Sequence, residues 1–232
     1  MKPRSIAVVA AHPDDEVLGC GGTLAAHAAA GDKVHVLILA EGIASRTGAR
    51  IAAEQARLHK AAAKACRILG FKTPELAGFP DNRMDSLDLL DVVQRVEAFF
   101  TAVKPQVIYT HHAGDLNIDH RIAHQVVVTA TRPLPGSPVA TLLFFETPSS
   151  TEWQTAAGGP VFAPNWFVDI TRTLPKKLTA LDAYVSELRA FPHPRSLEAV
   201  EHLARWRGAS NGVAAAEAFM LGRHLEGTTR RK

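Results

Sequence analysis

Residues 6–23 read IAVVAAHPDDEVLGCGGT and join a short apolar run to a cluster of ionisable side chains. Residues 6–10 are all apolar, as in a parallel strand with both faces covered. A histidine, a proline and three acids follow at residues 12–16. In an open α/β sheet, ligands bind beyond the carboxyl ends of the strands. The stretch therefore predicts a buried strand that ends at a reactive site.

A polar turn that caps a helix is the alternative interpretation of residues 12–16. Asp and Glu are favoured in the first turn of a helix, and Pro suits a turn. This alternative accounts for one or two of the carboxylates. It leaves the histidine and the remaining acid unexplained, so we favour a functional cluster.

The rest of the chain alternates between apolar runs of strand length and segments with helical spacing. Strands are expected at residues 34–40, 75–77, 107–110, 139–145 and 166–170, and helices at 24–30, 49–69, 87–103, 121–131, 174–189, 196–207 and about 213–222. Repeated strand–helix units predict an α/β fold with a mostly parallel sheet and helices on both faces. We expect a single domain over residues 1–232, with the sheet core in about 1–150 and a helical C-terminal extension in about 171–225.

Composition excludes several classes of protein. A hydrophobic content of 47% and a charged content of 21% are ordinary for a soluble globular chain. The net charge is only +3. The sequence has no stripe of Lys and Arg with interleaved aromatic residues, so nucleic-acid binding is not expected. No apolar segment is long enough to span a membrane. Cys20 and Cys66 lie too far apart to suggest a disulfide framework. We expect a cytoplasmic protein.

A second cluster of polar side chains follows the strand expected at residues 107–110. It contains His111, His112, Asp115, Asn117, Asp119 and His120. Because parallel strands end at one edge of a sheet, the two clusters are expected to form one site. His12 and Asp15 are three residues apart on a turn, and His120 completes a set of two histidines and one carboxylate. Three such ligands with a fourth position open to water are the usual catalytic zinc arrangement.

Two further acids have roles in this scheme. Asp14 adjoins a ligand but is itself free, so it is the candidate general base for a water molecule. Asp119 precedes His120 and is placed to orient an imidazole. The alternatives are that Asp119 caps a helix, that His120 lies in its first turn, and that Asp115 and Asn117 satisfy turn backbone. At least one of the neighbouring histidines, 111 or 112, is expected to be a solvated loop residue.

Two other readings of the first motif are less favourable. Asp14 and Asp15 without a metal would suggest a glycosidase, but adjacent residues rarely flank one scissile bond at the required separation. The glycines at 19, 21 and 22 suggest a dinucleotide site, but five polar residues separate the strand from this run, and its spacing differs from G-x-G-x-x-G.

The segments AHPDDEVLGCGGTLA (residues 11–25) and GDLNIDHR (residues 114–121) resemble the LmbE-like, or PIG-L, family of zinc-dependent N-acetyl-sugar deacetylases. The resemblance covers roughly the first 150 residues. It implies a Rossmann-like sheet without a nucleotide cofactor. It also implies that His12, Asp15 and His120 bind one Zn²⁺ per chain and that Asp14 is the general base. By ligand type, Fe²⁺, Co²⁺ or Mn²⁺ would also suit the set.

One position departs from the family pattern. Well-known members read H-x-D-H in the second motif, where the first histidine stabilises the oxyanion and is a candidate acid for the leaving amine. Asn117 stands there in this chain. An amide can donate a hydrogen bond to an oxyanion but cannot shuttle a proton. The acid is then Asp14 after it has taken a proton, or His193, held between Pro192 and Pro194; the alternative for His193 is a surface loop residue.

The sequence thus predicts a hydrolase that removes the acetyl group from an N-acetylated amino sugar or its conjugate. The candidates for substrate binding are Arg46, Asp81, Arg83 and Arg195, each with a solvated loop charge as the alternative. Two rival functions stay open: a non-catalytic sugar-binding or regulatory protein on the same fold, and a zinc hydrolase of a non-sugar amide. The expected partner is a small-molecule sugar substrate, and a homo-oligomer is left open.

Overall fold

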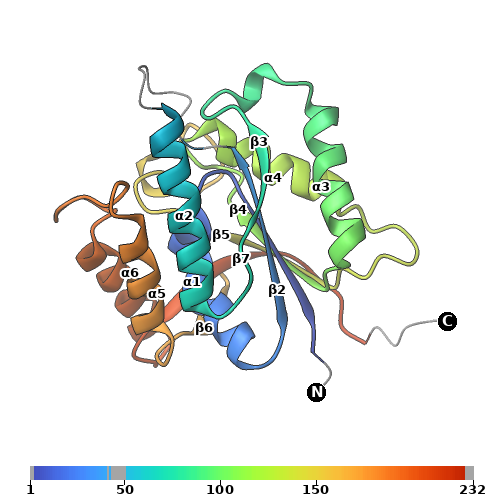
Figure 1. Cartoon of the computed structure of the whole chain (residues 1–232). Coiled ribbons are helices and arrows are strands. Elements are labelled where there is room, and N and C mark those ends of the chain that lie inside the picture. Colours follow the sequence, from blue (N-terminus) through green and yellow to red (C-terminus); the bar gives the residue numbers. More distant parts are fainter. Residues whose placement is uncertain (1–2, 41, 43–50, 228–232) are drawn as a thin grey trace.

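The computed structural model describes residues 3–40, 42 and 51–227. In this part of the chain, seven strands form one sheet in the order β3-β2-β1-β4-β5-β7-β6 (Figure 1). The strands are β1 (Ser5–Ala10), β2 (Lys33–Ala40), β3 (Glu75–Phe79), β4 (Val107–His111), β5 (Thr141–Phe145), β6 (Trp166–Asp169) and β7 (Ala216–His224). Pairing is parallel from β3 across to β5, whereas β7 runs antiparallel to both β5 and β6.

Helices cover both faces of the sheet (Figure 1). They are α1 (Asp15–Ala29), α2 (Ile51–Leu69), α3 (Leu89–Val103), α4 (Ile118–Ala130), α5 (Leu174–Leu181) and α6 (Leu197–Ala209), with short 3₁₀ helices η1 (Met84–Ser86), η2 (Thr151–Trp153) and η3 (Asp182–Tyr184). Alternate residues of β1 enter two separate cores. Ile6 and Val8 pack with α1, α2, α5 and α6, and Ala7 and Val9 pack with α3 and α4. The prediction of an α/β fold with a doubly covered, mostly parallel sheet is therefore confirmed.

The end of the chain corrects the sequence-based expectation. A helix was expected at about 213–222, and that prediction is wrong because β7 occupies 216–224 and completes the sheet between β5 and β6. Ala and Glu in the segment AEAF favour a helix intrinsically, but backbone pairing on both sides overrides that preference. The sheet therefore extends well beyond residue 150, and the C-terminal third is not an all-helical extension. The helix expected at 174–189 also ends early, at Leu181.

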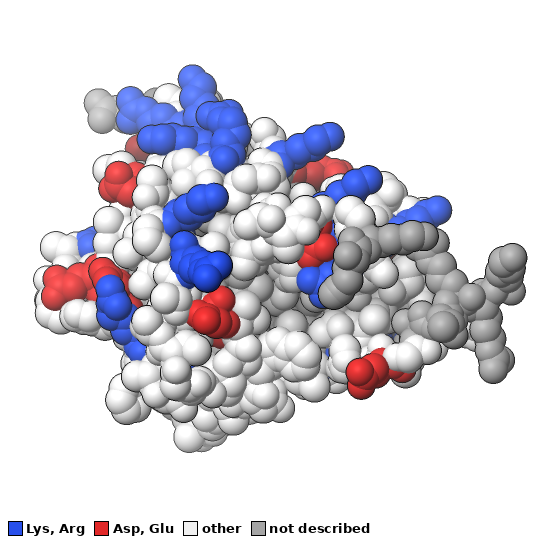
Figure 2. All heavy atoms as spheres, turned by 90° about the horizontal axis from the view of Figure 1, so that it is seen from below, with Lys and Arg blue, Asp and Glu red and all other residues white. Residues whose placement is uncertain are grey.

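Surface charge differs between parts of the molecule. From the edge opposite the carboxyl ends of the parallel strands, Lys and Arg gather along one margin while Asp and Glu are scattered (Figure 2). The basic side chains of α2 are exposed at Arg57, Lys60, Lys64 and Arg67, whereas Leu58 and Ala62 are buried. This distribution identifies the face of α2 that packs against the sheet.

No helix in the described ranges has the length and apolar character needed to cross a bilayer.

A buried ion pair joins β7 to the middle of α1. Helical geometry breaks at Cys20 (φ −146°, ψ 16°), so Gly22 and Thr23 begin a second helical segment whose first amides need acceptors. Both amides donate to the carboxylate of Glu217, at 2.9 and 2.7 Å. Lys177 donates to the same carboxylate at 2.6 Å, and both charged side chains are 4% exposed. The pair thus ties α5 and β7 to α1.

Removing the cation of this pair is predicted to be costly. Lys177→Met leaves the Glu217 carboxylate buried without its counter-charge, and the free energy of unfolding is expected to fall by about 3–5 kcal/mol. Arg205→Met is the matched control, because Arg205 pairs with Glu201 on the exposed side of α6 at 2.7 Å. That change is expected to cost below about 1 kcal/mol. Urea denaturation measures both, and equal losses would contradict the role of the buried pair.

Candidate metal centre

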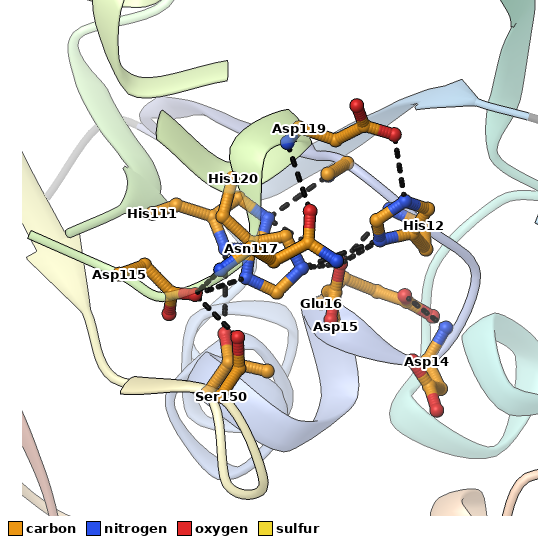
Figure 3. A network of polar contacts seen from close by, with 12 residues as sticks. His12, Asp14, Asp15, Glu16, His111, Asp115, Asn117, Asp119, His120 and Ser150 are labelled. Atoms are coloured by element: carbon orange, nitrogen blue, oxygen red, sulfur yellow. Dashed lines mark hydrogen bonds and ion pairs between the residues drawn. The ribbon is translucent and has the colours of Figure 1, made fainter. Parts of the chain in front are cut away.

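The site lies where β1 and β4, which are neighbours in the sheet, both end. α1 begins at Asp15, inside the first motif and three residues after His12. α4 begins at Ile118, three residues earlier than expected, with Asn117 as its N-cap. The side-chain oxygen of Asn117 accepts the Asp119 amide at 2.8 Å, as N-cap residues do. The first turn of α1 therefore carries Asp15, and the first turn of α4 carries Asp119 and His120 (Figure 3). His12 and Asp14 lie just before α1.

Three of the predicted residues form a compact triangle. His12 Nδ1 lies 3.2 Å from His120 Nε2. Asp15 Oδ2 lies 3.3 Å from each of these two nitrogens. The three ligand-type atoms face one another in the close-up (Figure 3). The structure thus brings together residues that are 108 positions apart in the chain.

The donor set suits a divalent cation. Asp15 is completely buried, and its Oδ1 has no hydrogen-bond partner among the described residues. A buried charged oxygen without a partner is unfavourable, and a bound cation would compensate it. Two imidazole nitrogens and one carboxylate are the protein donor set of many catalytic zinc sites. The residues present therefore fit the metal that the family resemblance implies.

The electrostatic field of the site also favours positive charge. Burial alone would lower the pKa of His12, but hydrogen bonds to Asp119 and Asp15 outweigh it and raise the pKa to about 10. Burial likewise opposes the charged form of His120, yet the charge of Asp15 and the contact with Asp115 raise its pKa to about 9. The surrounding carboxylates thus attract a cation to this position, whether a proton or a metal ion.

Asp119 contacts His12, not its sequence neighbour His120. Its Oδ2 lies 3.0 Å from His12 Nε2 and also accepts the Asn82 amide at 2.6 Å. Its Oδ1 accepts the Met84 amide at 3.1 Å. The imidazole that Asp119 is placed to orient is therefore that of His12 and not that of its neighbour His120, since adjacent residues of a helix project in different directions. Because backbone amides hold both of its oxygens, Asp119 is suited to orient His12, so we do not treat His12, Asp81 and Asp119 as a second metal site.

The carboxylate beside His120 is Asp115, to which the sequence argument gave only a turn role. Asp115 Oδ1 lies 3.1 Å from His120 Nδ1. The hydroxyls of Ser150 and Thr151 both donate to this carboxylate, the latter at 2.6 Å. Burial opposes ionisation, but the contact with His120 and the two hydroxyls hold the pKa of Asp115 well below its usual range. Asp115 also accepts the Asn117 amide at 2.9 Å, so the turn role and the orienting role coexist.

Asp14 is buried next to the triangle. Burial raises the pKa of its carboxyl to about 7, against the opposing charge of Arg195. Arg195 Nη1 donates to Asp14 Oδ2 at 3.2 Å. A carboxyl group with a pKa near the working pH suits general base catalysis. Arg195, expected to bind substrate, is therefore in contact with the candidate base.

The other predicted residues lie at different distances from the triangle. Asp81 is 2% exposed, and its Oδ1 lies 3.3 Å from His12 Nε2. Arg83 is exposed beside η1. His193 Nδ1 accepts the Arg195 amide at 3.1 Å, and its ring lies 5.7 Å from that of Trp153. Arg46 lies outside the described residues.

Asn117 and the two neighbouring histidines are more constrained than expected. Asn117 Nδ2 donates to Asn82 at 2.9 Å, which leaves one N–H of the amide for another acceptor. His111 and His112 are both buried, so the expectation that one of them is solvated is wrong. His111 Nε2 accepts the Ala11 amide at 2.9 Å and its ring stacks on His120, with 4.0 Å between centroids. His111 therefore supports a triangle residue through packing.

This chain is similar to several proteins that are described as deacetylases. Residues 7–131 match the PIG-L family, described as GlcNAc-PI de-N-acetylase. The 1D-myo-inositol 2-acetamido-2-deoxy-alpha-D-glucopyranoside deacetylase of Mycolicibacterium smegmatis is 27% identical, over 84% of each chain. The N,N'-diacetylchitobiose deacetylase of Pyrococcus horikoshii superposes with a TM-score of 0.77 at 18% identity, over 96% of this chain and 85% of that one.

One structural neighbour has a different activity. The 4-carboxy-2-hydroxymuconate hydratase of Pseudomonas putida KT2440 superposes with a TM-score of 0.76 at 24% identity, over 97% of this chain and 99% of that one. The fold alone therefore does not determine the reaction, which has to be argued from the site. The family match, in contrast, spans both motifs of the site and more than half of the chain. This chain belongs to the PIG-L, or LmbE-like, family.

Proposed function

We propose that this protein is a metal-dependent hydrolase that removes the acetyl group from an N-acetylated amino sugar or its conjugate. The observation that carries the proposal is the triangle of His12, Asp15 and His120, with the buried carboxyl of Asp14 beside it. The M. smegmatis relative, named as a deacetylase of an acetamido sugar, supports the choice of reaction.

The triangle would hold one Zn²⁺, and Fe²⁺, Co²⁺ or Mn²⁺ suit the same ligands. When bound, such an ion polarises the amide carbonyl and makes water a better nucleophile at neutral pH. Asp119 would orient His12 through Nε2, and Asp115 would orient His120 through Nδ1. Carboxylate partners of this kind fix the tautomer of a ligating imidazole.

Proton transfer falls to Asp14. We assign its Oδ1 to the attacking water, because Arg195 occupies Oδ2. Asp14 takes a proton as the water oxygen adds to the amide carbon, and the remaining N–H of Asn117 donates to the oxygen that gains charge. The C–N bond then breaks, the nitrogen takes a proton, and acetate and a free amine leave. Asp14 returns its proton to the nitrogen, and we propose that His193 assists as a hydrogen-bond donor: its Nδ1 accepts the Arg195 amide, so the neutral ring carries its proton on Nε2.

Recognition of the sugar is assigned to the charged residues Arg46, Asp81, Arg83 and Arg195. Arg83 is exposed and available to hydroxyl or phosphate oxygens, and Arg46 is assigned the same role from the sequence. Asp81 contacts His12, and Arg195 contacts Asp14. If either residue binds the substrate, it would do so close to the reacting amide. The cytoplasmic location, the single-domain organisation and the oligomeric state stay predictions.

A panel of substrates tests the proposed reaction against its rivals. The panel contains N-acetylglucosamine, its inositol and malate conjugates, N,N'-diacetylchitobiose, simple N-acetyl amines and an unsaturated hydroxy acid for hydration. Release of acetate from the sugar compounds supports the proposal. Turnover confined to the simple amides or to the hydroxy acid would replace it with the corresponding rival reaction. Binding of a sugar without turnover by the metal-loaded protein would favour the non-catalytic protein.

Metal content is predicted to depend strongly on the triangle residues and more weakly on the carboxylates that orient the two histidines. His120→Ala should reduce the metal content from about one ion per chain to near none, because one of three ligands is lost. Asp115→Asn should weaken metal affinity about 10- to 100-fold, because His120 loses its carboxylate partner. Elemental analysis and competition with a chelator measure the two effects. Asp182→Asn, an exposed carboxylate, is the control; full metal content in His120→Ala would contradict the site.

Two substitutions are predicted to separate the proton-transfer roles. Asp14→Asn should lower kcat about 10²- to 10⁴-fold with the metal retained, because the amide cannot accept the proton. His193→Ala should lower kcat by about tenfold or more, because the hydrogen-bond donor that we propose for the leaving nitrogen is lost. His202→Ala, an exposed histidine nearby, should leave kcat unchanged. Full activity in Asp14→Asn would exclude it as the base, and full activity in His193→Ala would leave proton return to Asp14 alone.

A further inference from the structure

The backbone at Asp14 adopts an unusual conformation. Its φ of 102° and ψ of −28° lie in the left-handed half of conformational space, where residues with a side chain are uncommon. Such a conformation persists only where surrounding contacts determine it, and these positions often lie at active sites. Contacts of the Asp14 backbone are therefore informative about how the carboxyl group is placed.

The Asp14 amide is held by Glu16. Its N–H donates to Glu16 Oε2 at 3.1 Å, and the close-up shows this contact on the side of Asp14 that faces α1 (Figure 3). The other oxygen, Oε1, accepts the hydroxyl of Tyr184 at 2.5 Å. Glu16 is 0% exposed and Tyr184 is 1% exposed, so no bulk water competes for these bonds. Both oxygens of Glu16 are thus engaged, one by Asp14 and one by the C-terminal region.

We propose that Glu16 and Tyr184 are positioning residues that hold the backbone of Asp14 in its left-handed conformation and so aim its carboxyl group at the reacting water. Tyr184 lies in η3, and Arg195 follows eleven positions later in the chain. Arg195 holds the carboxylate of Asp14 while Tyr184, through Glu16, holds its amide. The region after α5 therefore fixes the candidate base at two points. This inference rests on the proposed role of Asp14 as the base.

The geometry gives a reason for an acid at position 16. A carboxylate offers two oxygens that can each accept a strong hydrogen bond, whereas an amide offers one. Glu16→Gln keeps an oxygen for the Asp14 amide, but its NH2 group can only donate to the Tyr184 oxygen, so the hydrogen bond that the tyrosine hydroxyl donates is reversed or lost. Tyr184→Phe removes the hydroxyl and leaves Glu16 free to turn away from Asp14. Neither change alters a residue of the triangle.

The test compares Tyr184→Phe with Tyr109→Phe in the metal-loaded protein. Tyr109 is 2% exposed and its hydroxyl has one partner, His27 Nε2 at 2.9 Å, so each change removes one buried hydroxyl. Tyr184→Phe should lower kcat about 10- to 100-fold while KM stays within about twofold and metal content is unchanged, because misplacing a reacting group slows chemistry. Tyr109→Phe should keep wild-type kcat.

A second readout does not depend on activity. Hydrogen exchange of the Asp14 amide, followed by NMR, should be about tenfold or more faster in Tyr184→Phe than in wild type or Tyr109→Phe, because its acceptor is no longer fixed. Faster exchange together with the selective loss of kcat supports the inference. Unchanged exchange overturns it, as does loss of metal or equal kcat in the two tyrosine variants. If wild type deacetylates nothing, the proposed function fails, and the exchange rates alone decide whether Tyr184 holds Asp14.

Discussion

The buried carboxylate of Asp15 is the constraint on which the site depends. It is completely removed from solvent at the start of α1, and one of its oxygens lies within 3.4 Å of nitrogens from His12, His111 and His120. The His12 amide donates to the same oxygen at 2.9 Å, so the turn itself is shaped around this charge. A charge buried in this way needs compensation, and its other oxygen has no hydrogen-bond partner in the described chain. The arrangement is most readily explained as a site for a cation.

The C-terminal third of the chain contributes more to the site than its position in the sequence suggests. At the break in the helical geometry of α1, Glu217 accepts two backbone amides of the helix and pairs with Lys177. Tyr184 and Arg195 reach the backbone and the side chain of the candidate base through separate contacts. Contacts from the last third therefore help to hold α1 and the candidate base Asp14, which belong to the first motif. The residues after about 150 therefore belong to the structure of the site as well as to the fold.

The triangle could be predicted from the sequence because each of its residues lies close to the end of a recognisable strand. An apolar strand that ends in ligand-type residues places them at one edge of a parallel sheet, and His12, Asp15 and His120 follow from that rule. The partners of these residues could not be predicted in the same way. Asp119 meets His12 across more than 100 residues, and Asp115 meets hydroxyls from a distant loop. Such pairs depend on tertiary packing, which residue type and spacing do not encode.

The missed elements have similar causes. The strand at 216–224 contains residues with a helical preference, and only pairing with β5 and β6 decides its state. His111 ends β4 and His112 follows it, yet residues after β5 contact both side chains. The carbonyl of Pro160 accepts a hydrogen bond from His112 at 2.7 Å. Sequence position beyond a strand end thus did not imply exposure.

The most direct test of the central claim is X-ray absorption spectroscopy at the metal edge of the zinc-loaded protein. The account predicts two imidazole ligands and only nitrogen or oxygen donors, at about 2.0–2.2 Å, as two histidines and a carboxylate would give. Loss of one imidazole contribution in His120→Ala would assign the second ring. A spectrum with sulfur donors from Cys20 or Cys66, or with no histidine ligand, would contradict the site described above.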